Sequence, residues 1–179
     1  MACNITDGKG RPACPGETPG AYDTYFLFNR DQVASYVAGA GDIVEDITFD
    51  PGAGFYQVVG KKASVVARFE LQDDDTGATN YTHEVDARDV DWSAEALAFG
   101  KSLDGANLGV LVHTKGGKFI LYGYNDGMKK SVHNASTEAE ELGHFYTFRE
   151  TEVSEPPRIF LDTDEATTEA AILAKVVGS

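Results

Sequence analysis

Apolar and polar residues alternate along most of this chain, and alternation with a period of two predicts β-strands. In the clearest case, residues 62–71, nearly every second residue is apolar. An acidic turn at residues 73–77 follows, and a second alternating run returns along residues 80–88. We therefore expect a β-hairpin whose apolar face carries Ala63, Val65, Ala67, Phe69 and Leu71 on one strand and Tyr81, His83, Val85 and Ala87 on the other.

Further segments rich in aromatic and β-branched residues also predict strands. They are residues 22–29, 43–49, 55–59, 107–114, 118–124, 143–152 and 158–161. The turn Lys115-Gly-Gly joins two of them into a second hairpin, since glycine supplies the positive φ that tight turns require. A polar loop is expected between the turn Asn125-Asp-Gly and Gly143. Residues 31–38 are ambiguous, because Asp31 is also suited to cap a short helix.

One segment, residues 92–103, has the spacing of a helix. Trp92, Ala96, Phe99 and Leu103 recur on one face, and Ser93 is a suitable N-cap residue. We expect this apolar stripe to pack over the open face of a β-sandwich.

These elements predict a mainly β protein, a β-sandwich or partly closed barrel with one flanking α-helix. Residues 1–20 are rich in glycine and proline and predict an extended N-terminal arm. Residues 21–161 are expected to form the β-sandwich domain. Residues 162–179 are expected to be a C-terminal tail, or a short helix over 165–175.

The amino-acid composition narrows the range of possible functions. The 179 residues include 10 Phe and 8 Tyr, enough for a core, and the formal net charge is −14. Such acidity argues against DNA binding through phosphate neutralisation, which needs clustered Lys and Arg. The chain has no run of about 18 apolar residues, so no membrane span is expected. No secretory signal is visible, and Cys3 and Cys14 are able to pair only in an oxidising medium.

Candidate chemistry is sparse, and we expect no catalytic residues, cofactor-binding residues or metal ligands. Phe99-Gly-Lys-Ser lacks the glycine and the preceding strand of a phosphate-binding loop. Residues 73–75, three aspartates, fit a solvated hairpin tip better than a calcium loop. The four histidines, His83, His113, His133 and His144, are scattered along the sequence, so zinc is not expected. The chain is therefore not expected to be an enzyme.

The final third and the opening of the chain carry a resemblance. Its motifs are Tyr122-Gly-Tyr, Asn125-Asp-Gly, a Ser/Thr-containing loop over 131–141, the aromatic run His144-Phe-Tyr-Thr-Phe and an acidic run ending Glu155-Pro-Pro. The opening combines Lys/Arg-Gly segments with Cys14 and Gly20-Ala-Tyr. Together they resemble virion structural proteins of tailed bacteriophages, in particular the tail-tube-like family.

The resemblance implies a viral tail protein that forms stacked hexameric rings and so builds a DNA-conducting tube. Its expected partners are identical subunits in the same and adjacent rings, with sheath, baseplate or portal-side proteins as further candidates. DNA is expected to pass an acidic lumen without specific binding, because acids repel phosphates at short range. The acidic segments 73–75, 86–91 and 138–141 suit that role, and the location is the virion, assembled in the host bacterial cytoplasm.

Two alternatives remain open at this stage. One is a portal- or tail-end ring or connector protein. The other is a carbohydrate- or receptor-binding β-sandwich module, for which a surface patch of Trp and Tyr is expected; the chain has one Trp. For the assembly role, the Asn125-Asp-Gly turn and the loop 131–141 are expected to contact a neighbour or face the lumen.

Overall fold

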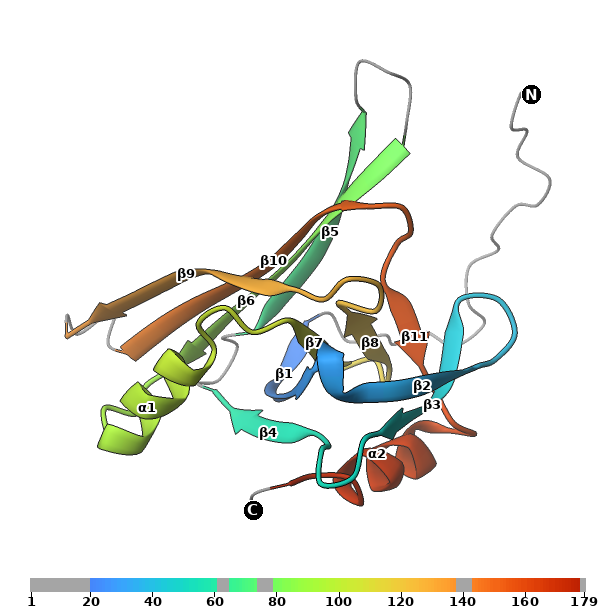
Figure 1. Ribbon diagram of the computed structural model, residues 1–179, viewed down its shortest axis with the longest axis horizontal. Coiled ribbons are helices and arrows are strands. Elements are labelled where there is room, and N and C mark those ends of the chain that lie inside the picture. The colour runs from blue at the N-terminus through green and yellow to red at the C-terminus, as the bar shows by residue number, and fades with distance from the viewer. Residues whose placement is uncertain (1–19, 61–64, 74–78, 138–142, 178–179) are drawn as a thin grey trace.

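The computed structural model describes residues 20–60, 65–73, 79–137 and 143–177 (Figure 1). Its described strands form two sheets that do not close into a barrel, with two helices at the periphery. The prediction of a mainly β sandwich with a flanking helix is therefore confirmed. Cys3, Cys14 and the predicted arm up to residue 19 lie outside the described residues, as do most of the acidic hairpin tip and the acids at 138–141.

The larger sheet has seven strands in the order β2-β3-β11-β8-β7-β1-β4. Strand β11 pairs parallel with β3, and the other pairings of this sheet are antiparallel. The strand bounds are β1 Ala21–Asn29, β2 Val33–Ala38, β3 Ile43–Phe49, β4 Tyr56–Val59, β7 Leu108–Thr114, β8 Phe119–Tyr122 and β11 Arg158–Phe160.

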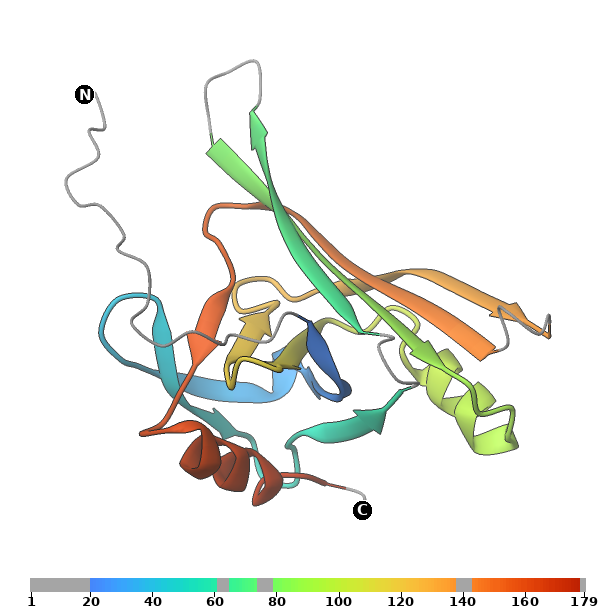
Figure 2. The ribbon, with the colours of Figure 1, turned by 180° about the vertical axis from the view of Figure 1, so that it is seen from behind.

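The smaller sheet has four strands in the order β5-β6-β10-β9, all antiparallel. Its strand bounds are β5 Val66–Asp73, β6 Thr79–Asp89, β9 Lys129–Ser136 and β10 Gly143–Val153. The β5–β6 hairpin extends beyond the rest of the molecule in both ribbon views (Figures 1 and 2).

Two apolar clusters cover opposite faces of the larger sheet. One cluster lies between the sheets and includes Tyr25, Val110 and Phe148. The other lies on the far face, where it includes Phe26 and the α2 residue Ile172. Residues 25–28 are consequently buried without interruption, because neighbouring residues of β1 enter different clusters.

Each of the two helices begins at a residue whose side chain caps its N-terminus. Helix α1 (Ala94–Ser102) begins as predicted at Ser93, whose hydroxyl accepts from the Ala96 N–H at 3.1 Å. Trp92 lies before the helix and is exposed, so it is not part of the buried helical face. Helix α2 (Glu165–Leu173) begins at Asp164, whose carboxylate accepts from the Thr167 N–H at 2.8 Å.

Two segments differ from expectation. The ambiguous region becomes a single 3-10 turn, η1 (Arg30–Gln32), followed by β2, because Val33 and its successors pair with β3. The expected polar loop contains a full strand, β9. Its side chains are mostly exposed, so it lacks the apolar alternation that identifies a half-buried strand.

Candidate assembly surface

The smaller sheet ends in two uncovered edges. No described strand pairs with the outer side of β5 or of β9. An edge strand presents unpaired N–H and C=O groups, which are a template for pairing with another chain. Because each of the three pairings in this sheet is antiparallel, β5 and β9 also run in opposite directions. These two edges are the first part of the candidate assembly surface.

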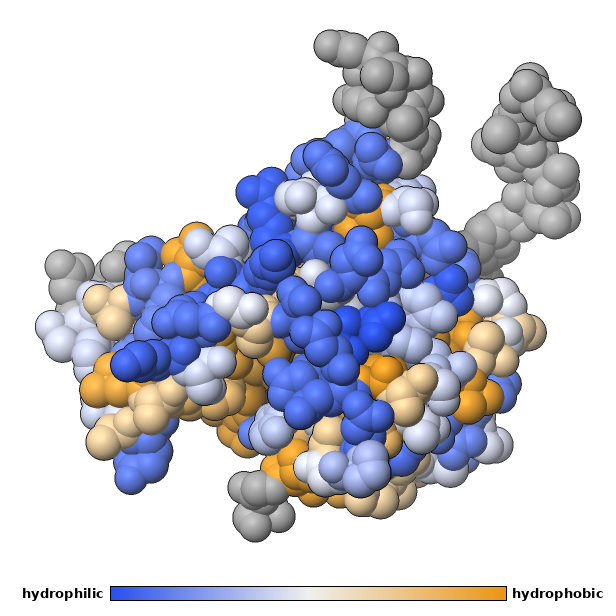
Figure 3. All heavy atoms as spheres, in the orientation of Figure 1, coloured by the Kyte–Doolittle hydropathy of each residue, from blue (hydrophilic) through white to orange (hydrophobic). Residues whose placement is uncertain are grey.

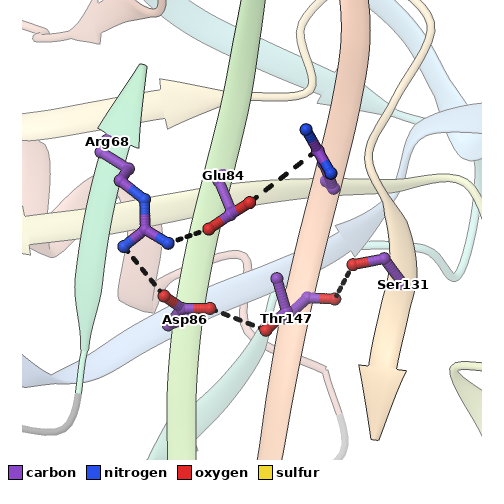
Figure 4. A network of polar contacts seen from close by, with 6 residues as sticks. Arg68, Glu84, Asp86, Ser131 and Thr147 are labelled. Atoms are coloured by element: carbon purple, nitrogen blue, oxygen red, sulfur yellow. Dashed lines mark hydrogen bonds and ion pairs between the residues drawn. The ribbon is translucent and has the colours of Figure 1, made fainter. Parts of the chain in front are cut away.

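Polar contacts cross all four strands on the outer face of this sheet (Figure 4). Arg68 on β5 forms ion pairs with Glu84 and with Asp86, the latter at 3.0 Å, and both acids lie on β6. The Thr147 hydroxyl on β10 donates to Asp86 Oδ1 at 2.7 Å. The Ser131 hydroxyl on β9 then donates to the Thr147 carbonyl oxygen at 3.1 Å.

Because of this network, the outer face of the smaller sheet is not uniformly acidic. Asp86 lies within β6, as expected for the strand over residues 80–88, but this member of the acidic segment 86–91 is paired with a cation. Arg149 adds a second cation 3.8 Å from Glu84. Exposed pairs of this kind each contribute about 0–1 kcal/mol to stability. Their main effect here is that the outer face presents charges of both signs rather than an acidic field.

The protruding β5–β6 hairpin is the third feature of the candidate assembly surface, after the sheet edges and the polar network. Phe69 and Leu71 were expected in the core, but their exposed fractions are 49% and 60%. Beside this hairpin, β10 shifts register between Glu150 and Val153, and Glu152 takes a φ of 61°. The Phe69 ring contacts that of Tyr81, with centroids 6.0 Å apart. Figure 3 shows mainly hydrophilic side chains around the base of this hairpin, with a small hydrophobic group among them.

The Asn125-Asp-Gly turn, expected to contact a neighbour or face the lumen, is held by residues of its own chain. The Arg30 Nε donates to the carbonyl oxygens of Tyr124 and Asn125 at 2.9 and 3.0 Å. The Asp126 N–H donates to the carboxylate of Glu150 at 3.2 Å. Glu150 is itself buried beside His83, with 3.4 Å between Oε2 and Nδ1. The turn therefore stabilises the junction of the two sheets.

The other candidate motif and the histidines lie in or between regular elements. Phe99-Gly-Lys-Ser lies in the last turns of α1, where the Ser102 hydroxyl donates to the Phe99 carbonyl at 2.7 Å. His133 and His144, distant in sequence, meet across β9 and β10. Within the described ranges, no three His, Cys, Asp or Glu side chains form a group able to hold a metal ion. The helices described there are also too short to cross a membrane.

Comparison with known proteins adds no relative to this geometry. No family model matches the chain, and neither a curated protein nor a solved structure matches it.

Proposed function

We propose that this protein is a structural subunit of a bacteriophage tail, which self-assembles into stacked hexameric rings that form a DNA-conducting tube. The observation that carries the proposal is the smaller sheet, with its even number of antiparallel strands and its two uncovered edges. The proposal also rests on the resemblance of the terminal motifs to tail-tube-like proteins.

The strand directions favour assembly by rotation. When a second copy is placed beside the first by rotation alone, its β5 lies next to the first copy's β9. The two strands then run antiparallel, as every other pair in the sheet does. Such a contact is head-to-tail and produces a ring if the rotation closes. Pairing also satisfies the backbone groups that edge strands leave open.

The charge of the chain suits a conduit more than a DNA-binding protein. A net charge of −14 repels phosphates, and at physiological salt this repulsion is limited to about 8 Å. The mixed charges of the outer sheet face, by contrast, provide no cluster of unpaired Lys or Arg for gripping a duplex. DNA would thus pass such a wall without being held.

The edges offer a direct test. Val66 on β5 and Val132 on β9 share the outer sheet face, and their exposed fractions are 50% and 40%. In the proposed ring Val66 and Val132 lie at the same interface. A lysine introduced at either position by Val66→Lys or Val132→Lys would lose water from its charge on assembly, which costs free energy. We expect either variant to weaken self-association about tenfold or more, which corresponds to about 1.4 kcal/mol.

The measurements are light scattering after size-exclusion chromatography and negative-stain imaging of rings and tubes. The matched control is Val37→Lys, since Val37 is 44% exposed on β2, an edge strand of the other sheet. Equal assembly of all three variants would place the interface elsewhere. A wild-type protein that stays monomeric at high concentration contradicts the proposal itself.

A further inference from the structure

A pair of histidines lies where α1 meets the smaller sheet. His133 on β9 and His144 on β10 approach each other with 3.1 Å between Nε2 and Nδ1. The His133 ring also stacks on that of Tyr146, at a centroid distance of 4.8 Å. Helix α1 approaches this pair at Gly100, where an added Cβ would lie 2.9 Å from His133 Cε1 and 3.0 Å from the Tyr146 hydroxyl, while the rest of His133 is exposed. The absence of a side chain at Gly100 is what allows the helix to sit this close.

A lysine ties the same helix to the same strand. Lys130 Nζ donates to the Gly100 carbonyl at 2.6 Å and pairs with Asp104 at 2.6 Å. A cation at the C-terminal end of a helix is favourable, because the last carbonyls carry partial negative charge. The side chain of Lys130 is almost completely buried, so this positive charge is held close to His133.

The histidine contact limits how many protons the pair holds. Two imidazole nitrogens at 3.1 Å form a hydrogen bond only if one donates and the other accepts. When both rings are imidazolium, both facing nitrogens carry hydrogen and positive charge. His144 is fully buried, and its Nε2 has no hydrogen-bond partner among the described residues, so a charge on this ring gains no hydrogen bond there and interacts with the Asp91 carboxylate only through space.

The charged groups around the two histidines do not remove this limit on the number of protons that the pair holds. Burial first, then Lys130 and His144, lower the pKa of His133, while Asp104 acts in the opposite direction. Asp104 and Asp91 have lowered pKa values, through hydrogen bonds from Lys130 and Ser93 respectively, and both are exposed. They therefore remain ionised in the range in which His133 titrates.

The other ionisable groups around the two histidines include Tyr146, Asp89 and Lys101. Burial, with a smaller contribution from Asp89, raises the pKa of Tyr146 to about 12, so its hydroxyl stays neutral. Asp89 is the β6 residue opposite His144 in the strand register, and Lys101 of α1 acts on Asp104.

We propose that the His133–His144 pair is an acid-sensitive latch, which holds α1 on the smaller sheet and releases it when the pair takes up a second proton. Separation of the two rings displaces His133 from the position that Gly100 covers. The close contact at Gly100 is then lost, which leaves the Lys130 contacts alone to hold the helix, and the inner face of the smaller sheet opens at this end.

The direction of the pH dependence follows from linkage. In the unfolded chain a histidine has a pKa of about 6.5. The folded pKa of His133 is lower, so the released or unfolded state binds more protons in the window below about 6.5. The latched state is fully favoured above that value and loses stability as the pH falls through the window.

The chain contains its own probe for this event. Trp92 is the sole tryptophan, and its ring lies 4.6 Å from that of His144. We expect Trp92 emission to stay constant above about pH 6.5 and to change in a sigmoidal way as the pH falls below that value. Over the same range, amide protection of residues 94–102 should fall about tenfold relative to β7, measured by hydrogen exchange with intrinsic rates corrected for pH.

His133→Gln is the decisive variant, because glutamine cannot take up the second proton and His133 lies exposed on an edge strand. We expect it to abolish both transitions. The control is His113→Gln, since His113 contacts Glu165 of α2 instead; this variant should retain both. An unchanged protection of α1 in the wild type overturns the proposal, as does an equal response of His133→Gln.

Discussion

At the scale of single residues, the closest fit in the core is between Gly109 and Phe28. A Cβ placed on Gly109 of β7 would lie 1.9 Å from Phe28 Cζ, inside the ring's contact distance. The ring cannot move aside, because it is held edge-on by Phe49 and Phe55, each with a centroid distance of 5.6 Å. The position opposite Phe28 on β7 thus requires glycine for space rather than for backbone conformation.

We therefore expect Gly109→Ala to lower the free energy of unfolding by about 1–3 kcal/mol, the usual cost of overpacking a core. Urea denaturation followed by circular dichroism measures this difference. The control is Gly39→Ala, where the new methyl meets only the mobile side chain of Glu45. Comparable losses in both variants would show that the cost comes from the glycine backbone and not from Phe28.

At the scale of elements, alternation and capping predicted those parts of the fold that bury one face. The pairing of β5 with β6 and the Ser93 cap of α1 are examples. Strand β9 was missed because its side chains are mostly polar and exposed, so it lacks apolar alternation, although it pairs with the next strand of the chain, β10. The same strand pairing brings His133 to His144, so a scattered set of histidines in sequence gave no sign of the contact.

Helix α2 has one buried apolar side chain, Ile172, beside the buried polar Thr168. Ile172 is fully buried in the cluster on the far face of the larger sheet, whereas the next residue, Leu173, is exposed. We expect Ile172→Ala to cost about 2–5 kcal/mol of unfolding free energy, as large-to-small core substitutions do. Leu173→Ala is the matched control and should change it by less than about 0.5 kcal/mol. Thermal denaturation of the two variants makes the comparison, and similar melting temperatures would mean that α2 contributes little to the core.

At the scale of the whole molecule, the two sheets have different surroundings. The larger sheet is covered on both faces, by the smaller sheet and by α2 with its cluster. The smaller sheet keeps a polar outer face, two open edges and a protruding hairpin with exposed Phe69 and Leu71. The smaller sheet is thus the one that the proposed assembly uses for contacts with other copies.

Assembly through these edges brings together subunits that each carry a net charge of −14. The proposed pairing uses backbone hydrogen bonds, so salt should weaken the repulsion more than it weakens the attraction. The Debye length falls from about 30 Å at 0.01 M to about 8 Å at 0.15 M salt. We therefore expect the assembled fraction to rise over this range, measured by sedimentation velocity at constant protein concentration. If ion pairs between subunits dominated instead, the same increase in salt would dissociate the rings. A fall in the assembled fraction would therefore count against strand-edge pairing as the main contact.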